Sequence, residues 1–333
     1  MKASLLAKTL EKTIPAHEPV LIKGAPGVGK TDITHQICGL VNADLVVEHP
    51  VVSDPTDYKG LPFAMPGTDS ATFLPFGDLK RLIEADRLTV CFIDDLGQAP
   101  AAVQAACMQL ILARSINGHR VSPHVSFVAA TNRHTDRAGV TGLLEPVKSR
   151  FVTIIELEVD TDDWVNWALN AKLPVELISF IRFRPGLLWD FKPTNELKNS
   201  PCPRTVHNVS KLMNLGLPRE VEYEAFSGAA GEGFAAEFVG FLRIFRSLPN
   251  PDIVMMAPDK AAVPDDPATL YAICGALAQK ASDNTMDRLV QYANRLPAEF
   301  SVLLVRDCVR VSPGVVNTRA FIEWASQNKD VLI

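Results

Sequence analysis

The chain has 333 residues, which corresponds to about two domains of ordinary size. Hydrophobic residues make up 47% of the chain and charged residues 21%, a composition that excludes a disordered protein and can fill folded cores. The net charge of −5 gives no electrostatic indication of a nucleic-acid partner, and no apolar stretch reaches the roughly 18 residues that a membrane span needs.

The cysteines indicate a reducing compartment. They are scattered along the chain, and no two form the CxxC pair of a redox motif or zinc site. The six are Cys38, Cys91, Cys107, Cys202, Cys274 and Cys308. Residues 1–19 contain lysines throughout and no apolar segment of the kind that directs secretion. We therefore expect a cytoplasmic protein without a membrane attachment.

Short apolar runs alternate with helical patterns in the first half of the chain. The apolar runs, which predict strands, cover 18–24, 44–52, 88–95, 125–132 and 151–157. Helical spacing of apolar residues covers 32–41, 77–86, 99–114 and 137–149. Strands that are apolar on both faces and separated by helices are typical of a parallel sheet covered on both sides. We expect an α/β domain over 1–158.

Only helical patterns follow residue 158. They cover 161–171, 174–184, 204–215, 218–230 and 233–247, and they return between 267 and 329. The intervening segment, 248–267, is rich in proline and predicts a linker or long loop. We therefore expect an α-helical lid domain at 159–247, and a linker with a helical C-terminal extension at 248–333.

A phosphate-binding loop joins the first predicted strand to the first predicted helix. The segment GAPGVGKT matches GxxxxGK[ST] in full. Its glycines let backbone N–H groups approach phosphate oxygens, and the following helix directs its positive end toward the same phosphates. The lysine would reach the β- and γ-phosphates, and the threonine hydroxyl would ligate Mg²⁺. The loop consists of Gly24, Ala25, Pro26, Gly27, Val28, Gly29, Lys30 and Thr31.

Polar side chains stand at the ends of the predicted strands 88–95 and 125–132. Asp94 and Asp95 follow VCFI, at the position where an acid can meet the Mg²⁺ held by Thr31. We expect Asp94 on the metal side, and Asp95 to orient or deprotonate the attacking water. Asn132 ends the next strand, VAATN, and is suited to hydrogen-bond a water or a γ-phosphate oxygen.

These segments together resemble the AAA+ ATPases, and among them the MoxR-like branch. The resemblance covers about residues 1–245. GAPGVGKT is similar to Walker A, VCFIDD to Walker B and VAATN to the sensor 1 strand. EPVKSRF at 145–151 and CPRT at 202–205 complete the ordered set. The fold that this resemblance implies is an AAA+ P-loop parallel sheet with helices on both faces, followed by an α-helical lid.

The resemblance also assigns arginines. Arg150, in KSRF, matches the arginine finger that reaches the γ-phosphate bound by the neighbouring subunit; the alternative is a surface arginine at a helix C-terminus. Arg133 and Arg137 are rival fingers in the loop after Asn132. Arg204 matches sensor 2, which folds the lid onto the nucleotide; the alternative is an ordinary residue of a helix's first turn.

One residue departs from the family pattern. Walker B usually ends in Asp–Glu, whereas this chain has Asp94–Asp95. The shorter carboxylate lies about one methylene further from the water. We therefore expect either slow hydrolysis or help to Asp95 from another group.

Two insertions match the branch. The segments 53–63 and 67–79 correspond to an insertion around the second helix that would line the pore or upper face of a ring. Within it, Tyr58, Lys59 and Gly60 are similar to the aromatic–x–Gly pore loops that grip polypeptide, although an Asx turn followed by a glycine turn explains them equally well. A second segment, 114–124, predicts a hairpin with an Asn–Gly turn.

The function implied is that of a ring-forming MoxR-like ATPase, with a hexamer expected. It would bind and hydrolyse Mg-ATP between protomers and remodel, assemble or activate a client protein, as a chaperone does. The resemblance suggests a partner with a von Willebrand factor A domain. Two alternatives remain: a DNA-handling AAA+ protein of the clamp-loader or helicase-associated kind, and an ATP-gated assembly switch that hydrolyses slowly.

Overall fold

A computed structural model of the chain describes residues 1–136 and 142–329. The chain divides into two compact units, Met1–Asp160 and Thr161–Ile333. Among the described residues, no helix combines the length and apolar character that crossing a membrane requires.

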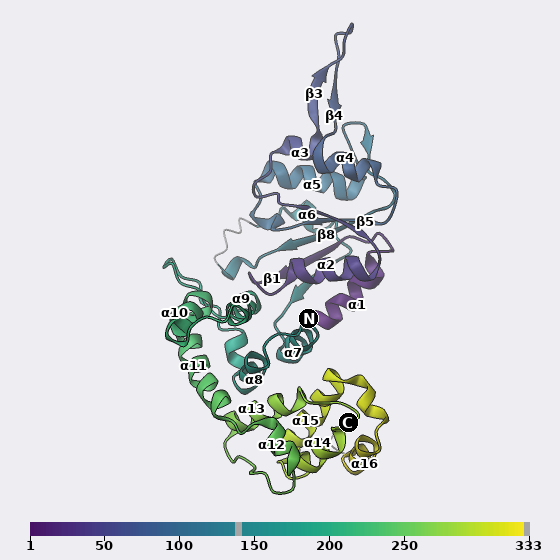
Figure 1. The fold of residues 1–333 in the computed structure, drawn as a ribbon. Helices are drawn as coiled ribbons and strands as arrows, with labels where there is room; N and C mark the ends of the chain where they lie inside the picture. Colours follow the sequence, from purple (N-terminus) through teal and green to yellow (C-terminus); the bar gives the residue numbers. More distant parts are fainter. Residues whose placement is uncertain (137–141, 330–333) are drawn as a thin grey trace. The chain divides into compact units, whose positions relative to one another are not determined.

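A five-stranded parallel sheet organises the first unit (Figure 1). The order of its strands is β2–β5–β8–β1–β9. They are β1 (Val20–Gly24), β2 (Asp44–Glu48), β5 (Thr89–Ile93), β8 (Val125–Thr131) and β9 (Thr153–Leu157). The sheet confirms the predicted α/β class. Strand β2 is shorter than the predicted 44–52, and Pro50, which has no N–H to donate to a ladder, lies just beyond its end.

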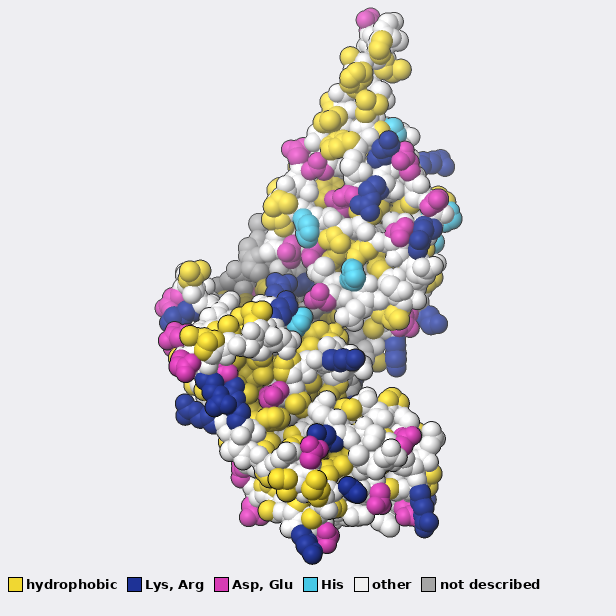
Figure 2. Space-filling view, in the orientation of Figure 1, with side chains coloured by type: hydrophobic (Ala, Val, Ile, Leu, Met, Phe, Trp, Pro, Cys, Tyr) yellow, Lys and Arg dark blue, Asp and Glu magenta, His cyan; other side chains and the backbone are white. Residues whose placement is uncertain are grey.

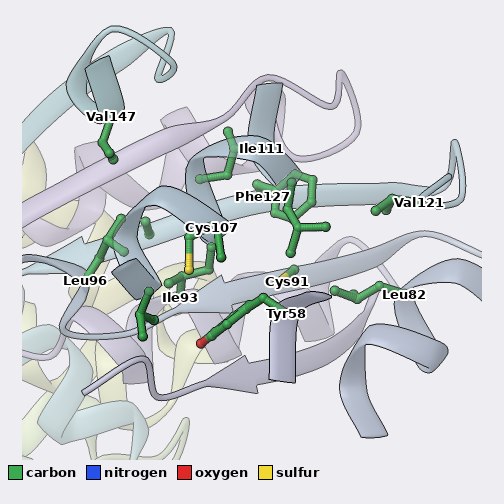
Figure 3. Close-up of a cluster of buried hydrophobic side chains, with 14 of the residues drawn as sticks. Tyr58, Leu82, Cys91, Ile93, Leu96, Cys107, Ile111, Val121, Phe127 and Val147 are labelled. Carbon is green, nitrogen blue, oxygen red and sulfur yellow. The ribbon is translucent and has the colours of Figure 1, made fainter. Parts of the chain in front are cut away.

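Helices cover both faces of this sheet. Successive side chains of a strand point to opposite faces, so Val90 and Phe92 join one buried cluster while Cys91 and Ile93 join the other. The first cluster includes side chains of α1 (Ala3–Thr13) and α2 (Lys30–Leu40). The second includes those of α3 (Pro55–Lys59), α4 (Gly77–Glu84), α5 (Ala101–Ala113) and α6 (Glu145–Lys148). All six cysteines of the chain are free and buried, and Figure 3 shows two of them in the second cluster.

Two hairpins extend from the helix-covered sheet. The longer pairs β3 (Leu61–Ala64) with β4 (Ala71–Leu74), between α3 and α4 (Figure 1). The sequence of this segment resembles an insertion and does not predict these two strands. The shorter pairs β6 (Ser115–Ile116) with β7 (His119–Arg120) and confirms the hairpin predicted at 114–124. Asn117 and Gly118 at its turn both have positive φ, as a tight two-residue hairpin turn requires.

The helix predicted at 137–149 is present only in part. Residues 137–141 lie outside the described part of the chain, and α6 begins at Glu145. Pro146 stands in its first turn, the place where a proline is tolerated because that N–H has no helical partner. Of the described residues in the predicted range, 142–144 are not helical, so the prediction placed the start of the helix too early there.

The second unit is helical. Its helices are α7 (Thr161–Asn170), α8 (Val175–Phe183), α9 (Pro203–Asn214), α10 (Arg219–Ala230), α11 (Glu232–Ser247), α12 (Pro251–Met256), α13 (Pro267–Ala278), α14 (Met286–Ala293), α15 (Ala298–Val311) and α16 (Arg319–Gln327). Phenylalanines of α8, α10 and α11 pack ring against ring, for example Phe180 against Phe238 at 5.0 Å between centroids. A buried ion pair joins Arg182 of α8 to Asp307 of α15.

The proline-rich segment 248–267 contains a helix that was not predicted. Asn250 caps α12 by accepting a hydrogen bond from the Asp252 N–H, with Pro251 in the first turn. Val254 and Met255 are buried in the core of the C-terminal helices. The segment is thus packed structure over part of its length, and the prolines mark the ends of a short helix.

Candidate functional site

The phosphate-binding loop lies at the carboxyl end of the central strand β1, which pairs with β8 on one side and β9 on the other. Such an edge of a parallel sheet is where ligands of α/β folds bind. Gly29 immediately precedes α2 and has φ of +100°, a conformation that side-chain-bearing residues rarely adopt. The first N–H groups of α2 have no partner within the helix, so its start suits an anion.

Lys30 connects the carboxyl end of β1 to that of the neighbouring strand β8. Its Nζ donates to the carbonyl oxygens of Gly24 at 2.9 Å and Ala25 at 3.0 Å, and to Oδ1 of Asn132 at 2.6 Å. Lys30 and Asn132 are each only 7% exposed. A buried ammonium needs such acceptors because leaving it unpaired would cost several kcal/mol (about 3 to 5). The loop lysine and the strand-end asparagine are therefore in direct contact.

Thr31 and Asp94 form the second contact. The Thr31 hydroxyl donates to Oδ2 of Asp94 at 2.8 Å, and Oδ1 of Asp94 accepts the backbone N–H of Asp95 at 3.0 Å. A hydroxyl and a carboxylate side by side form an all-oxygen donor set, the kind that Mg²⁺ prefers together with substrate phosphates. The residues present therefore fit the expected metal ion.

Asp95 occupies a left-handed backbone conformation, with φ of +54° and ψ of +32°. Aspartate and asparagine tolerate this region better than longer side chains do. Oδ1 of Asp95 accepts a hydrogen bond from Nδ2 of Asn132 at 2.9 Å. The departure from a Walker B glutamate thus has a local reason, because the backbone at this position favours the shorter acid.

Gln98 also belongs to this group, and sequence analysis missed it. Its Oε1 lies 3.3 Å from Nδ2 of Asn132, the nitrogen that also donates to Asp95. Gln98 ends the 3₁₀ helix η1 (Leu96–Gln98), which begins directly after Asp95. The only sequence signal was its place three residues after the predicted catalytic acid.

The candidate arginine fingers differ in their partners. Arg133 makes a bidentate pair with Asp136, both contacts at 2.9 Å, which raises the pKa of its guanidinium. Arg150, after α6, bonds the Ser149 hydroxyl at 3.1 Å, and its buried Nε has no hydrogen-bond partner. Among described residues, no carboxylate pairs with Arg150. Arg137 lies outside the described residues.

Arg204 lies in the second unit, in the first turn of α9 and exposed to solvent. A cation near a helix N-terminus gains nothing from the helix dipole, which favours anions there. Its sensor 2 role stays a prediction.

Tyr58 does not supply the exposed aromatic ring that the pore-loop prediction requires. The residue is 2% exposed and packs among Cys91, Cys107 and their neighbours beneath α3 (Figure 3). Asp54 caps α3 with a capping box, and Gly60 ends it with φ of +83°. A Cβ on Gly60 would lie 2.8 Å from the Leu74 carbonyl oxygen. The capped turn, the alternative interpretation, describes this segment.

Glu48 links the site to the base of the longer hairpin. Its carbonyl accepts the N–H of Asp94 at 2.9 Å. Burial, and then the negative charges of Asp78 and Asp57, raise the pKa of its side chain to about 7, while a hydrogen bond with Tyr58 acts in the opposite direction. A carboxyl group that titrates near neutral pH therefore stands between the metal-side aspartate and the helices that flank the hairpin.

The family comparison agrees with this geometry. The model of the AAA domain (dynein-related subfamily) matches residues 19–151. The matched range contains the phosphate-binding loop, the paired aspartates, Asn132 and Arg150. Residues 19–151 therefore form an AAA domain, the domain of a P-loop ATPase.

Comparisons of whole chains found only distant likenesses. The structure is similar to RuvB of Thermotoga maritima, a Holliday junction branch migration motor, at 15% identity and a TM-score of 0.37, over 98% of this chain and 86% of that one. It is also similar to NtrX of Brucella abortus in complex with ADP, at 14% identity and a TM-score of 0.41. That match covers 99% of this chain and 68% of the NtrX chain. No curated protein matches the chain.

Proposed function

We propose that this chain, whose residues 19–151 form an AAA domain, is a MoxR-like ATPase that hydrolyses Mg-ATP between the protomers of a ring, a hexamer, and so remodels or activates a client protein in the cytoplasm. One observation carries the hydrolysis part of the proposal. The ends of three adjacent strands hold Lys30, Asn132 and Asp95 in one hydrogen-bonded chain, beside the Thr31–Asp94 pair.

Each of these residues has a task during hydrolysis. Lys30 exchanges its carbonyl and amide acceptors for phosphate oxygens, and Asn132 is then free to bond the γ-phosphate or the water. Asp95 takes the proton of the attacking water. Thr31 and Asp94 would hold Mg²⁺, which supplies positive charge to the phosphate oxygens.

Arg150 is the proposed finger for the neighbouring protomer. Its guanidinium lacks a carboxylate partner among described residues, whereas Arg133 is held by Asp136. A cation that no carboxylate of its own chain neutralises is available to stabilise the charge that develops in the transition state of another subunit. Arg204 is proposed to close the lid onto the same nucleotide.

The longer hairpin supports a protein client. Leu61, Phe63, Met65 and Leu74 are each between 44% and 55% exposed, and hydrophobic side chains cover much of the hairpin in Figure 2. Apolar groups gathered on a surface are typical of protein interaction sites. The client, for which a protein with a von Willebrand factor A domain is our candidate, would bury them.

A mixing experiment tests the shared site. Lys30→Ala removes the nucleotide site and keeps the finger, and Arg150→Ala does the reverse. Each alone should lose about 10³-fold in turnover per subunit. Mixed, they should regain turnover, because some interfaces then combine an intact site with an intact finger.

The matched control is the double variant, which should stay inactive alone and give no recovery when mixed with Lys30→Ala. Wild-type turnover per subunit should also rise with protein concentration, and Arg133→Ala should remain close to wild type. Flat turnover with a silent Arg150→Ala would mean that the site is complete within one chain.

A further inference from the structure

We propose that Gln98 is a catalytic residue that orients the attacking water together with Asp95, and so supplies the reach that the aspartate lacks. This inference rests on the proposed ATP hydrolysis and names a further residue of the same site. It explains how an AAA domain can work with aspartate where a glutamate is usual.

The local backbone brings the two side chains to one face. Asp95 precedes η1, and the N–H of Gln98 donates to the Asp95 carbonyl at 2.9 Å. The side-chain oxygens of Asp95 and Gln98 both come within 3.3 Å of one atom, Nδ2 of Asn132. The two side chains therefore lie on the same side of this turn.

Asn132 ties both side chains into the site. Its Oδ1 accepts from Lys30, and its Nδ2, which as an amide nitrogen can only donate, contacts Oδ1 of Asp95 and Oε1 of Gln98. The two oxygens thus flank one nitrogen at 2.9 and 3.3 Å. When Asn132 turns to the phosphate, they become a pair of acceptors for the two hydrogens of one water.

The division of labour follows from side-chain length. The left-handed backbone favours the short acid at position 95, whereas glutamine has the same number of methylenes as glutamate. Asp95 supplies the negative charge and Gln98 the reach. In the reaction, the water oxygen bonds to the γ-phosphorus and the bond from phosphorus to the bridging oxygen breaks with its electron pair on ADP. One water proton passes to Asp95.

A double-mutant cycle tests this assignment. Gln98→Ala should lower kcat by about 10- to 100-fold with unchanged ATP affinity. In the Asp95→Glu background, where the acid itself reaches further, the same change should cost less than about threefold. Gln36→Ala, on the exposed face of α2, is the matched glutamine control and should leave kcat unchanged.

A pH profile supplies the second readout. Gln98→Glu keeps the length and adds a carboxylate beside Asp95, so the acid limb of the kcat profile should move to higher pH. If Gln98 had only a structural role, Gln98→Ala would lower kcat by the same factor in the wild-type and Asp95→Glu backgrounds, or it would weaken ATP binding. Either result, or kcat within twofold of wild type for Gln98→Ala, overturns the assignment. A wild type without turnover overturns the proposed hydrolysis itself.

Discussion

The nucleotide site and the β3–β4 hairpin belong to the same unit and are built in opposite ways. At the site, polar side chains that are buried or partly buried bond one another and so hold each other in place. On the hairpin, apolar side chains are exposed on two strands that pair only with each other in a two-stranded sheet. The contacts among these polar groups form within one chain, whereas the hairpin leaves apolar surface that a partner would cover.

Breaking the site should give the largest effect. Lys30→Ala removes the cation that joins the loop to Asn132, and we expect turnover to fall by about 10³-fold with weaker ATP binding. Turnover and ATP titration measure the two losses. Lys8→Ala, on the exposed side of α1, is the charge-matched control. Normal turnover in Lys30→Ala would contradict the assignment of the loop.

Breaking the core beneath the hairpin should come next. Tyr58→Ala removes a buried ring and should lower the free energy of unfolding by about 3 to 5 kcal/mol. Tyr58→Phe loses only a hydroxyl, which lies 3.5 Å from the Ser53 hydroxyl and hydrogen-bonds the Glu48 carboxyl, so its cost should stay below about 1.5 kcal/mol. Urea unfolding compares the two. A stable Tyr58→Ala variant with lost client activity would restore the pore-loop interpretation.

Glu48, which links the nucleotide site to the base of the hairpin, should make the stability of the protein depend on pH. The pKa of Glu48 is about 7 in the folded protein against an ordinary value of 4.5, so between these values the folded state binds more protons than the unfolded state. This group's contribution to stability therefore falls as pH rises from about 4.5 to 7. Glu48→Gln should remove that slope and stabilise the protein at pH 8 by on the order of 1 to 2 kcal/mol.

Urea unfolding at several pH values measures the effect of Glu48→Gln, with Glu18→Gln, an exposed carboxylate, as the control. Parallel profiles for wild type and Glu48→Gln would show that Glu48 ionises as an exposed acid does.

Changing the hairpin alone should have the smallest effect on the isolated protein. Phe63→Asp places a charge on a side chain that is 55% exposed, so we expect turnover within twofold of wild type and stability within about 0.5 kcal/mol. Client-dependent activity should be lost. The control is Asp69→Asn at the exposed turn of the same hairpin. A large loss of basal turnover would mean that the hairpin serves the site directly.

Sequence analysis succeeded where burial imposed a pattern. The strands of the sheet are apolar on both faces and the polar side chains of the candidate site follow them directly, so the sequence could predict the strand ends and which polar residues gather there. The longer hairpin was missed because its strands bury no face, so no alternation of apolar and polar residues appears. Pro62 argues further against a strand from sequence alone.

Short helices were also difficult to predict from the sequence. The turn that presents Gln98 spans three residues, too few for any periodicity, and α12 is hidden among prolines that otherwise indicate a linker. Arg204 was identified by resemblance, and its distance from the nucleotide depends on how the two units are arranged. Local patterns carry no information about that arrangement.

The buried cysteines make the native protein a poor target for thiol reagents. Thiolate is the reactive form, and burial raises the pKa of Cys38 to about 11 and that of Cys107 and Cys308 to about 12. A thiol introduced by Thr68→Cys, at the exposed tip of the longer hairpin, would react with a maleimide far faster than these. A photocrosslinker can therefore be attached to the hairpin without removing the native cysteines from the core, and the client captured directly.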